Sequence, residues 1–383
     1  MSIFSAAPEP ESRLAHYRLL SPKAGVHVSP IQLGGMSIGD KWDGLMGSMD
    51  KEASMKLLDA YYDAGGNFID TANLYQDGSS EAFIGEWAEK RGIRDRLFIA
   101  TKYAHNVHLM KKTEPHRILH AGGNAKSLHM SIKNSLERLR TDYVDLLYVH
   151  WWDYDTSVEE VMQSLHTLVL QGKVLYLGIS DTPAWVVSMA NQYARDHALT
   201  PFSVYQGLWN VLDRSFERDI IPMARAQGMA LAPWNVLCGG KIRTDAEEER
   251  RAASNENGRG GDSWRRTERE KLMSQALEKV AAEVGAKHIT SVAIAYVMQK
   301  TTYVFPIIGG RKVEHLLQNI EALEISLSDE QIAFIESVVA FDPGFPNYLI
   351  GDGSSYNGLW TSSGTLDRVR VEPIRPKPRS SIE

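Results

Sequence analysis

Short apolar runs alternate regularly with longer amphipathic stretches along this chain, and no other feature limits its possible folds as strongly. Several runs are apolar almost throughout, as are parallel strands that helices cover on both faces. There are eight, at residues 31–36, 67–71, 97–102, 144–150, 174–180, 202–206, 229–234 and 304–310. Eight strands that are each followed by a helix predict an α/β protein with a (β/α)8 barrel, the TIM barrel.

The stretches between the runs carry helical patterns. One set of apolar side chains, at residues 128, 132, 136 and 139, is spaced by 4, 4 and 3, which places it on one helix face. Helix-ending glycines follow four stretches, at residues 65, 92, 172 and 228. A doubly wound open sheet is the main alternative. Against it, residues 34–39 read Gly-Gly-Met-Ser-Ile-Gly and lack the Gly-x-Gly-x-x-Gly nucleotide loop.

Two segments outside the repeat precede and interrupt the predicted barrel. Residues 17–20 and 26–29 predict an N-terminal hairpin around residues 23–25. Residues 241–269 follow the seventh strand, are rich in Arg, Glu, Asn and Gly, and contain few apolar side chains. They predict a long loop.

The C-terminal part differs from the repeat. Residues 328–341 predict an extra helix, and residues 342–383 are rich in Pro, Gly and Ser and predict an irregular tail. We therefore expect one domain over residues 1–383, with a core at 15–345 and a tail at 346–383.

Composition limits the partners. The net charge of −6 offers no basic surface for nucleic acid, and the apolar runs are shorter than the roughly 20 residues that cross a bilayer. The first 20 residues contain charges and no continuous apolar segment, so we expect a cytoplasmic protein without a membrane partner. The single cysteine, Cys238, excludes an intrachain disulfide, and no base is indicated that would make it a nucleophile.

A histidine-rich stretch raises the question of a metal. The histidines stand at residues 105, 108, 116, 120 and 129. No acidic or cysteine partner stands at ligand spacing from them, so we expect no metal site.

Polar residues end the predicted strands, where barrel enzymes place their active sites. Asp70 ends the second strand, Lys102 the third and His150 the fourth, and Tyr75 follows Asp70 by five residues. This set suits proton donation by tyrosine. A free tyrosine has a pKa near 10, and a lysine cation close to the phenol lowers that pKa by stabilising the phenolate. Asp70 would hold the lysine, and His150 would bind the substrate oxygen or relay the proton.

In this order and strand context, Asp70, Tyr75, Lys102 and His150 resemble the catalytic tetrad of the aldo-keto reductases. The resemblance spans residues 15–345 and is most specific to fungal aryl-alcohol dehydrogenases and norsolorinic-acid-reductase-like proteins. The segments that carry it are residues 33–42, 148–153, 178–185 and 305–319. It implies an oxidoreductase in which Tyr75 is the general acid/base and hydride passes between NADPH and a carbonyl carbon.

The resemblance also implies how the cofactor binds. It places the carboxamide at Ser180, Asp181 and Gln206, the pyrophosphate at residues 233–239, and the adenosine phosphate at residues 309–319. The family position whose side chain stacks on the nicotinamide aligns with Leu231, which is not aromatic. Asp181 stands where many family members have asparagine. The implied NADPH/NADP+ contacts are Met36, Ser37, Asp70, Ser180, Asp181, Gln206, Leu231, Ala232, Pro233, Trp234, Asn235, Val236, Leu237, Lys241, Gly309, Gly310, Arg311, Lys312, His315, Gln318 and Asn319.

The adenosine-phosphate segment has a physical interpretation of its own. Gly309, Gly310, Arg311 and Lys312 lie between the eighth strand and the next helix. Flexible backbone, two cations and a helix N-terminus form an anion site, and the cations favour the 2′-phosphate of NADPH over NADH. The family's usual serine of this site falls on Gly310 or Arg311.

The predicted substrate is an aromatic aldehyde or the corresponding alcohol, bound by Trp42, Tyr75, His150 and Trp151. Two alternatives stay open. One is an NADP-binding regulatory subunit with little turnover, like the β subunits of potassium channels, which have the same barrel. The other is a reductase of a polyketide aryl ketone. The oligomeric state is not indicated by the sequence.

Overall fold

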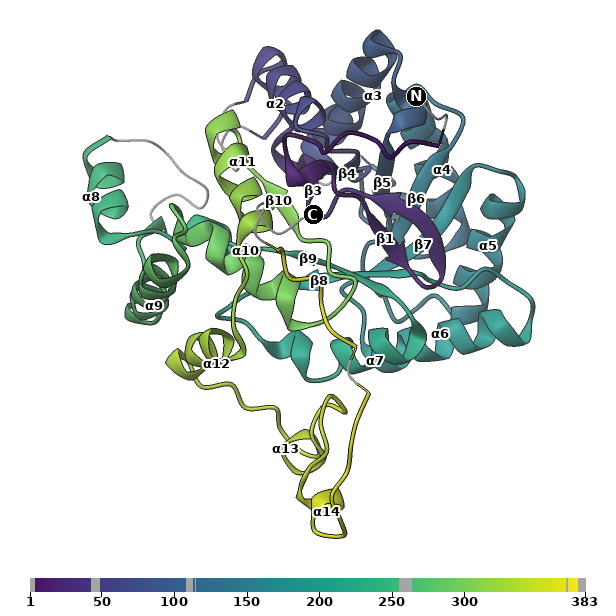
Figure 1. Ribbon diagram of the computed structural model, residues 1–383. Helices are drawn as coiled ribbons and strands as arrows, with labels where there is room; N and C mark the ends of the chain where they lie inside the picture. Colours follow the sequence, from purple (N-terminus) through teal and green to yellow (C-terminus); the bar gives the residue numbers. More distant parts are fainter. Residues whose placement is uncertain are drawn as a thin grey trace.

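Eight parallel strands form one continuous sheet that curls into a barrel (Figure 1). The computed structural model describes residues 4–42, 49–107, 113, 115–254, 264–369 and 371–377. In spatial order the strands are β10 (Ile307–Gly309), β3 (Gln32–Gly34), β4 (Phe68–Asp70), β5 (Phe98–Tyr103), β6 (Val144–Val149), β7 (Val174–Ser180), β8 (Val204–Leu208) and β9 (Ala230–Trp234). The sheet closes at Leu231, whose N–H donates to the Tyr303 carbonyl (2.9 Å) and whose carbonyl accepts from the Phe305 N–H (2.8 Å). The predicted (β/α)8 barrel is confirmed.

A ring of helices covers the outer face of the barrel (Figure 1). Its members are α2 (Lys51–Asp63), α3 (Ser79–Arg91), α4 (Ala125–Leu139), α5 (Val158–Leu170), α6 (Ala184–Asp196), α7 (Ile220–Gln227), α10 (Ile289–Lys300) and α11 (Val313–Ile320). The predicted helix-ending glycines lie at positive φ after α2, α3, α5 and α7. No helix in the described ranges is long and apolar enough to cross a membrane.

Side chains along each strand alternate between the barrel interior and the layer under the helices, because the side-chain period of a strand is two. Phe68 and Phe98 pack inside the barrel, whereas their neighbours Ile69 and Ile99 pack against the helices. This alternation continues to the strand ends. It turns Asp70, two residues after Phe68, toward the barrel axis.

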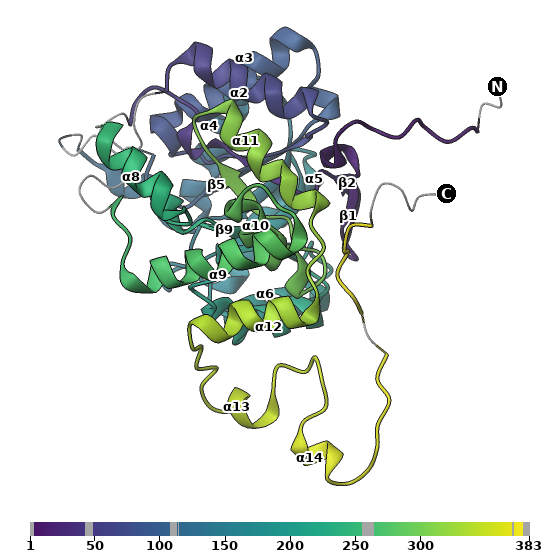
Figure 2. The same ribbon diagram turned by 60° about the vertical axis from the view of Figure 1, so that its left-hand side comes forward.

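The predicted N-terminal hairpin closes one end of the barrel. It consists of β1 (Arg18–Ser21) and β2 (Ala24–Val28), and its turn lies at residues 22–23, just ahead of the predicted one. Leu20 and Val28 pack against Phe68 and Phe305 inside the barrel. Figure 2 shows the hairpin on the opposite side of the barrel from α8 (Asp245–Ser254). The C-terminal ends of the strands are therefore the open end.

Residues 241–269 are not wholly the long loop that the sequence predicts. They contain α8 and the first two residues of α9 (Glu268–Val284), and residues 255–263 lie outside the described ranges. The buried guanidinium of Arg266 holds α8 through Asp245 and Glu248, which lie near its N-terminus. Because α8 is polar on nearly every face, it shows no apolar periodicity in the sequence.

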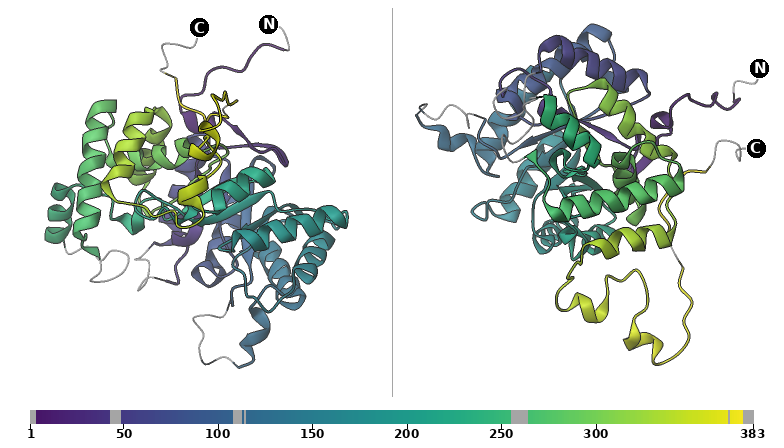
Figure 3. Two further views of the ribbon diagram at one scale, coloured as in Figure 1. Left: turned by 90° about the horizontal axis from the view of Figure 1, so that it is seen from below. Right: turned by 90° about the vertical axis from the view of Figure 1, so that its left-hand side faces the viewer.

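The C-terminal extension begins with the predicted extra helix, α12 (Asp329–Val338). The irregular tail that follows lies outside the barrel and contains two short helical turns, α13 (Asn347–Ile350) and α14 (Gly358–Thr361) (Figure 3). Its start is held by Arg218, which donates to the Asp342 and Pro343 carbonyls at 2.8 and 3.0 Å.

The packing of the hairpin predicts its contribution to stability. Leu20→Ala removes a side chain that is 0% exposed, and we expect it to lower the free energy of unfolding by about 2–5 kcal/mol. The matched change Leu170→Ala removes a side chain that is 75% exposed on α5, and its effect should stay within about 0.5 kcal/mol. Urea unfolding measures both. Equal losses would show that the hairpin does not fill the barrel.

Candidate active site

Lys102 and Asp70 form an ion pair at the open end of the barrel. The Lys102 side chain is 0% exposed, and its Nζ lies 2.6 Å from Asp70 Oδ1. Nζ also donates to the Thr71 carbonyl (2.8 Å) and to Tyr75 Oη (3.2 Å). Gln206 of β8 donates from Nε2 to the second oxygen of Asp70 at 2.9 Å. Three neighbouring oxygens thus fix the position of one buried ammonium group.

The protonation of Lys102 depends on that carboxylate. Burial lowers the pKa of Lys102, whereas the charge of Asp70 raises it, and the net pKa lies above the ordinary value. The ammonium form is therefore the stable one in the folded protein.

Tyr75 stands at the start of a strained turn after β4. The turn, η3 (Tyr75–Gly78), has Gln76 and Asp77 at φ of 54° and 53°, a region that side chains other than glycine enter at a cost. Gln76 holds the turn: its amide accepts from the Trp42 N–H (2.8 Å) and donates to the Met36 carbonyl (3.0 Å). The sequence gives no signal for this role of Gln76, because nothing in its spacing distinguishes it from a surface glutamine.

The environment of Tyr75 differs from the expectation in one respect. The sequence predicts a lowered pKa, but burial raises the pKa of Tyr75 by more than the charge of Lys102 lowers it. The carboxylates of Asp70 and Asp181 raise it as well. Lys102 therefore offsets part of the desolvation, and the phenol is protonated at neutral pH.

His150 follows β6 and shares the mouth with Tyr75. The two ring centroids are 5.9 Å apart at 77°. The His105 ring also packs against His150, with the two ring centroids 4.4 Å apart. Burial, with the charges of Lys102 and His105, holds the pKa of His150 well below its ordinary value, so the imidazole is neutral. Its Nδ1 is buried without a hydrogen-bond partner among the described residues. In the sequence, His105 stands out only as part of the histidine-rich stretch, for which no metal site is expected. Its contact with His150 is not predicted.

Three neighbouring strands present amide-binding groups beside the tetrad. The Ser180 hydroxyl at the end of β7 is buried and has no hydrogen-bond partner among the described residues. Asp181 follows at a φ of 43°, and its N–H donates to the Gln206 carbonyl at 3.0 Å. Trp234 of β9 donates its indole N–H to Asp181 Oδ1 at 3.1 Å. A buried hydroxyl next in the chain to a carboxylate, with an amide on the neighbouring strand, fits the carboxamide of a nicotinamide.

The structure does not place Leu231 at the mouth. Leu231 lies in the layer under the helices, whereas its neighbours Ala230 and Ala232 face the barrel interior. The same alternation turns Trp234 toward the open end, where it lies half-buried. Trp234, which the resemblance also gives as a cofactor contact, is therefore a side chain of β9 that borders the mouth, whereas Leu231 is not.

The other predicted cofactor residues border the same end of the barrel. Met36 and Ser37 lie in the turn after β3, and Pro233 and residues 235–237 lie in or just after β9. The Lys241 ammonium pairs with Glu270 at 3.1 Å. In the adenosine-phosphate segment, Gly309 ends β10, and Lys312 caps α11. Further along this segment, Arg311 and Gln318 are half-buried, His315 is exposed and Asn319 is buried.

The predicted substrate side chains fall into two groups. Trp151 is half-buried, and its ring lies 6.0 Å from that of His105, so it borders the mouth. Trp42 is buried, and its indole N–H donates to Asp77 at 3.0 Å. It packs with Met36 and Tyr75, so one of its roles is to brace the turn that carries the phenol.

The sequence raises the question of two other kinds of reactive group, a metal site and the cysteine thiol. The described residues contain no cluster of three or more His, Cys, Asp or Glu that would hold a metal ion, and His108 lies outside the described ranges. Burial raises the pKa of the Cys238 thiol to about 12, so it carries little thiolate at neutral pH.

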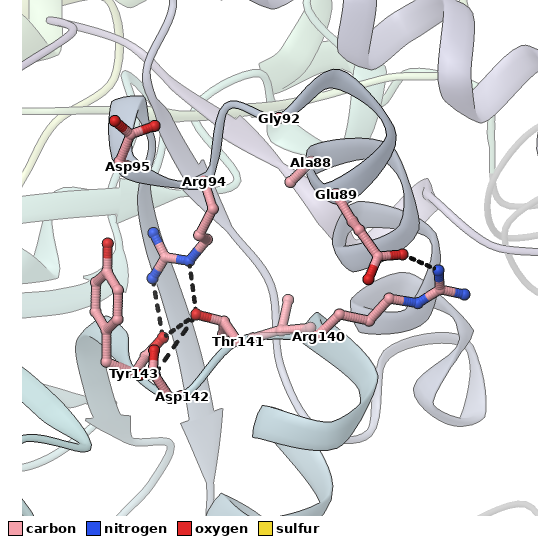
Figure 4. A pocket seen from close by; sticks show the side chains of 10 residues that line it. Ala88, Glu89, Gly92, Arg94, Asp95, Arg140, Thr141, Asp142 and Tyr143 are labelled. Atoms are coloured by element: carbon pink, nitrogen blue, oxygen red, sulfur yellow. Dashed lines mark hydrogen bonds and ion pairs between the residues drawn. The ribbon is translucent and has the colours of Figure 1, made fainter.

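A hollow of about 640 Å³ lies at the opposite end of the barrel, between the ends of α3 and α4 (Figure 4). Its main cation, Arg94, pairs with Asp145 at 2.8 Å and also donates to the Thr141 hydroxyl and the Leu97 and Tyr143 carbonyls. These contacts engage the guanidinium within the protein. We therefore assign Arg94 a structural role and do not place a binding site in this hollow.

Known proteins resemble this chain over most of its length. A profile of the aldo/keto reductase family matches residues 30–340. The NADP(+) aryl-alcohol dehydrogenase of Phanerodontia chrysosporium is 59% identical, with 98% of this chain and 100% of the relative aligned. The putative aryl-alcohol dehydrogenase AAD14 of Saccharomyces cerevisiae is 56% identical over 91% of this chain and 93% of its own. Norsolorinic acid reductase A of Aspergillus parasiticus is 50% identical over 91% and 87%.

The buried ion pair generates a stability prediction. Asp70→Asn leaves the Lys102 ammonium without its counter-charge, and we expect a loss of about 3–5 kcal/mol in the free energy of unfolding near neutral pH. Without Asp70, the folded-state pKa of Lys102 falls below its unfolded value of about 10.4, so the loss shrinks as the pH rises toward that value. In the parent protein the folded pKa is the higher one, so the stability that the pair contributes is lost as the pH rises from the unfolded pKa through the folded pKa.

Urea unfolding at neutral and alkaline pH measures this loss. Asp59→Asn is the matched control, because Asp59 pairs with Arg91 at 2.6 Å on the surface, where ion pairs contribute about 0–1 kcal/mol. An Asp70→Asn protein as stable as the parent near neutral pH would contradict the importance of the pair.

Proposed function

This chain belongs to the aldo/keto reductase family, and from that premise we propose that it is a cytoplasmic, NADPH-dependent enzyme that interconverts aromatic aldehydes and aryl alcohols. One observation carries the proposal: a buried ammonium within hydrogen-bond distance of both a carboxylate and a phenol at the open end of the barrel. The names of the aryl-alcohol dehydrogenase relatives support the substrate class and the cofactor.

Tyr75 acts as the proton donor in carbonyl reduction. When bound, NADPH supplies the hydride. Tyr75 Oη gives its proton to the carbonyl oxygen, and the charge of Lys102, 3.2 Å away, stabilises the phenolate that remains. Asp70 keeps Lys102 charged and in place, and Gln206 fixes Asp70. In alcohol oxidation the same phenolate accepts the proton.

His150 orients the substrate oxygen. Its imidazole is neutral and close to Tyr75, so it can hydrogen-bond the carbonyl without repelling Lys102. A neutral hydrogen-bond donor at that oxygen favours the charge that develops there during hydride transfer. Tyr75 and His150 together define where a carbonyl must lie to react.

The cofactor is held along the rim of the open end. Ser180, Asp181 and Gln206 would hold the carboxamide, and Trp234, which donates to Asp181, would border the nicotinamide site. Residues 309–312 and the start of α11 would hold the adenosine phosphate. Arg311 and Lys312 favour NADPH over NADH, because NADPH carries an additional 2′-phosphate on its adenosine ribose and these two cations attract its negative charge.

Aromatic rings favour an aryl substrate. His105 and Trp151 flank the site on the side of His150, and flat rings stack well on an aryl group. A bulkier aryl ketone is the second candidate, because norsolorinic acid reductase A is 50% identical to this chain over the aligned residues.

Replacing the proton donor tests the mechanism. Tyr75→Phe removes only the phenolic hydroxyl, and we expect kcat for benzaldehyde reduction to fall roughly 100- to 10,000-fold while the Kd for NADPH stays unchanged. NADPH oxidation with substituted benzaldehydes, aliphatic aldehydes and aryl ketones measures turnover, with NADH run in parallel.

The matched control is Tyr154→Phe, which removes an exposed hydroxyl from the loop after β6. It should leave turnover unchanged. Saturable NADPH binding by the parent without turnover of any carbonyl would instead support a regulatory subunit. Activity that survives in Tyr75→Phe would show that another group donates the proton.

A further inference from the structure

Asp181 places a carboxylate beside the nicotinamide site. Its Oδ1 accepts the Trp234 indole N–H at 3.1 Å, and its backbone N–H bonds to β8 at 3.0 Å. Two neighbouring strands therefore fix both its main chain and its side chain. The positive φ of 43° is a conformation that aspartate and asparagine adopt more readily than most residues.

The neighbouring charged groups do not neutralise the negative charge of Asp181. Lys102 is balanced by Asp70 at 2.6 Å, and the imidazole of His150 is neutral. Burial raises the pKa of Asp181, whereas its hydrogen bond from Trp234 and the charge of Lys102 lower it, and the Asp181 carboxylate in turn raises the pKa of Tyr75. Asp181 thus adds one negative charge to a site whose other charged pair is neutral overall.

A nicotinamide ring is cationic when oxidised and neutral when reduced. We propose that the Asp181 carboxylate makes this protein discriminate between the two redox states, binding NADP+ more tightly relative to NADPH than an amide at this position would. The inference rests on the proposed function, because it takes the carboxamide to lie at Ser180, Asp181 and Gln206. It assigns Asp181 a role in setting the reaction equilibrium on the enzyme, beyond holding the carboxamide.

The size of the effect follows from charge interactions. An opposite charge within about 4–6 Å shifts an ionisation equilibrium by roughly one to three pKa units, which is roughly 10- to 1,000-fold. Asp181 lies at the open rim, where water screens charges, so the lower end applies. We expect Asp181→Asn to raise the ratio of the Kd for NADP+ to the Kd for NADPH about tenfold. Stabilising NADP+ on the enzyme favours carbonyl reduction over alcohol oxidation once substrates are bound.

Asp181→Asn isolates the charge. Asparagine keeps the size, tolerates the positive φ, and offers Trp234 the same acceptor oxygen. The amide can also donate to the carboxamide, so NADPH binding should stay equal or strengthen. Asp155→Asn is the matched control, because it removes an exposed carboxylate from the loop after β6 at the same end of the barrel.

The experiment is a titration of the parent, Asp181→Asn and Asp155→Asn proteins with NADP+ and with NADPH, followed by tryptophan fluorescence near pH 8, where carboxylates are ionised. Binding, not turnover, is the readout. A ratio that rises about tenfold in Asp181→Asn and stays constant in Asp155→Asn supports the proposal. A ratio unchanged in Asp181→Asn overturns it while leaving the proposed function intact. A parent protein that binds neither nucleotide contradicts both.

Discussion

The ion pair between Lys102 and Asp70 is the interaction on which the site depends. An ammonium group without exposure to water is costly, and the carboxylate 2.6 Å away makes its charge stable. The other groups of the site depend on the Lys102 charge. Tyr75 lies 3.2 Å from the ammonium, the charge helps to keep His150 neutral, and Gln206 holds the Asp70 carboxylate in place. The barrel supplies the geometry, because its strand ends bring these residues together from distant parts of the sequence.

Much of the fold could be predicted from the sequence because its signals are local. Apolar runs and helix-ending glycines reveal a parallel sheet under helices, and the hairpin follows from two short runs around a turn. The helix α8 could not be predicted, since ion pairs with Arg266 rather than an apolar face hold it. The hairpin's packing inside the barrel also depends on contacts between residues that are remote in sequence, such as Leu20 and Phe305.

The tetrad could be proposed from strand ends, whereas its supporting contacts could not. Which side of a strand faces the axis follows from a period of two, and applying that period to β9 distinguishes Trp234 from Leu231. The bracing of the Tyr75 turn by Gln76, and the contact of His105 with His150, arise only when separate loops meet. The pKa of Tyr75 likewise reflects the depth of burial, which no local pattern reports.

The most direct measurement of the central claim is the pH dependence of single-turnover hydride transfer in both directions. If Tyr75 carries the proton, oxidation of an aryl alcohol by NADP+ needs the phenolate, and its rate should rise between about pH 6 and pH 10. Reduction of the aldehyde needs the phenol, and its rate should stay constant over this range and fall only at higher pH, as the pH approaches the raised pKa of Tyr75. Rates that do not depend on pH in either direction would contradict proton transfer by Tyr75.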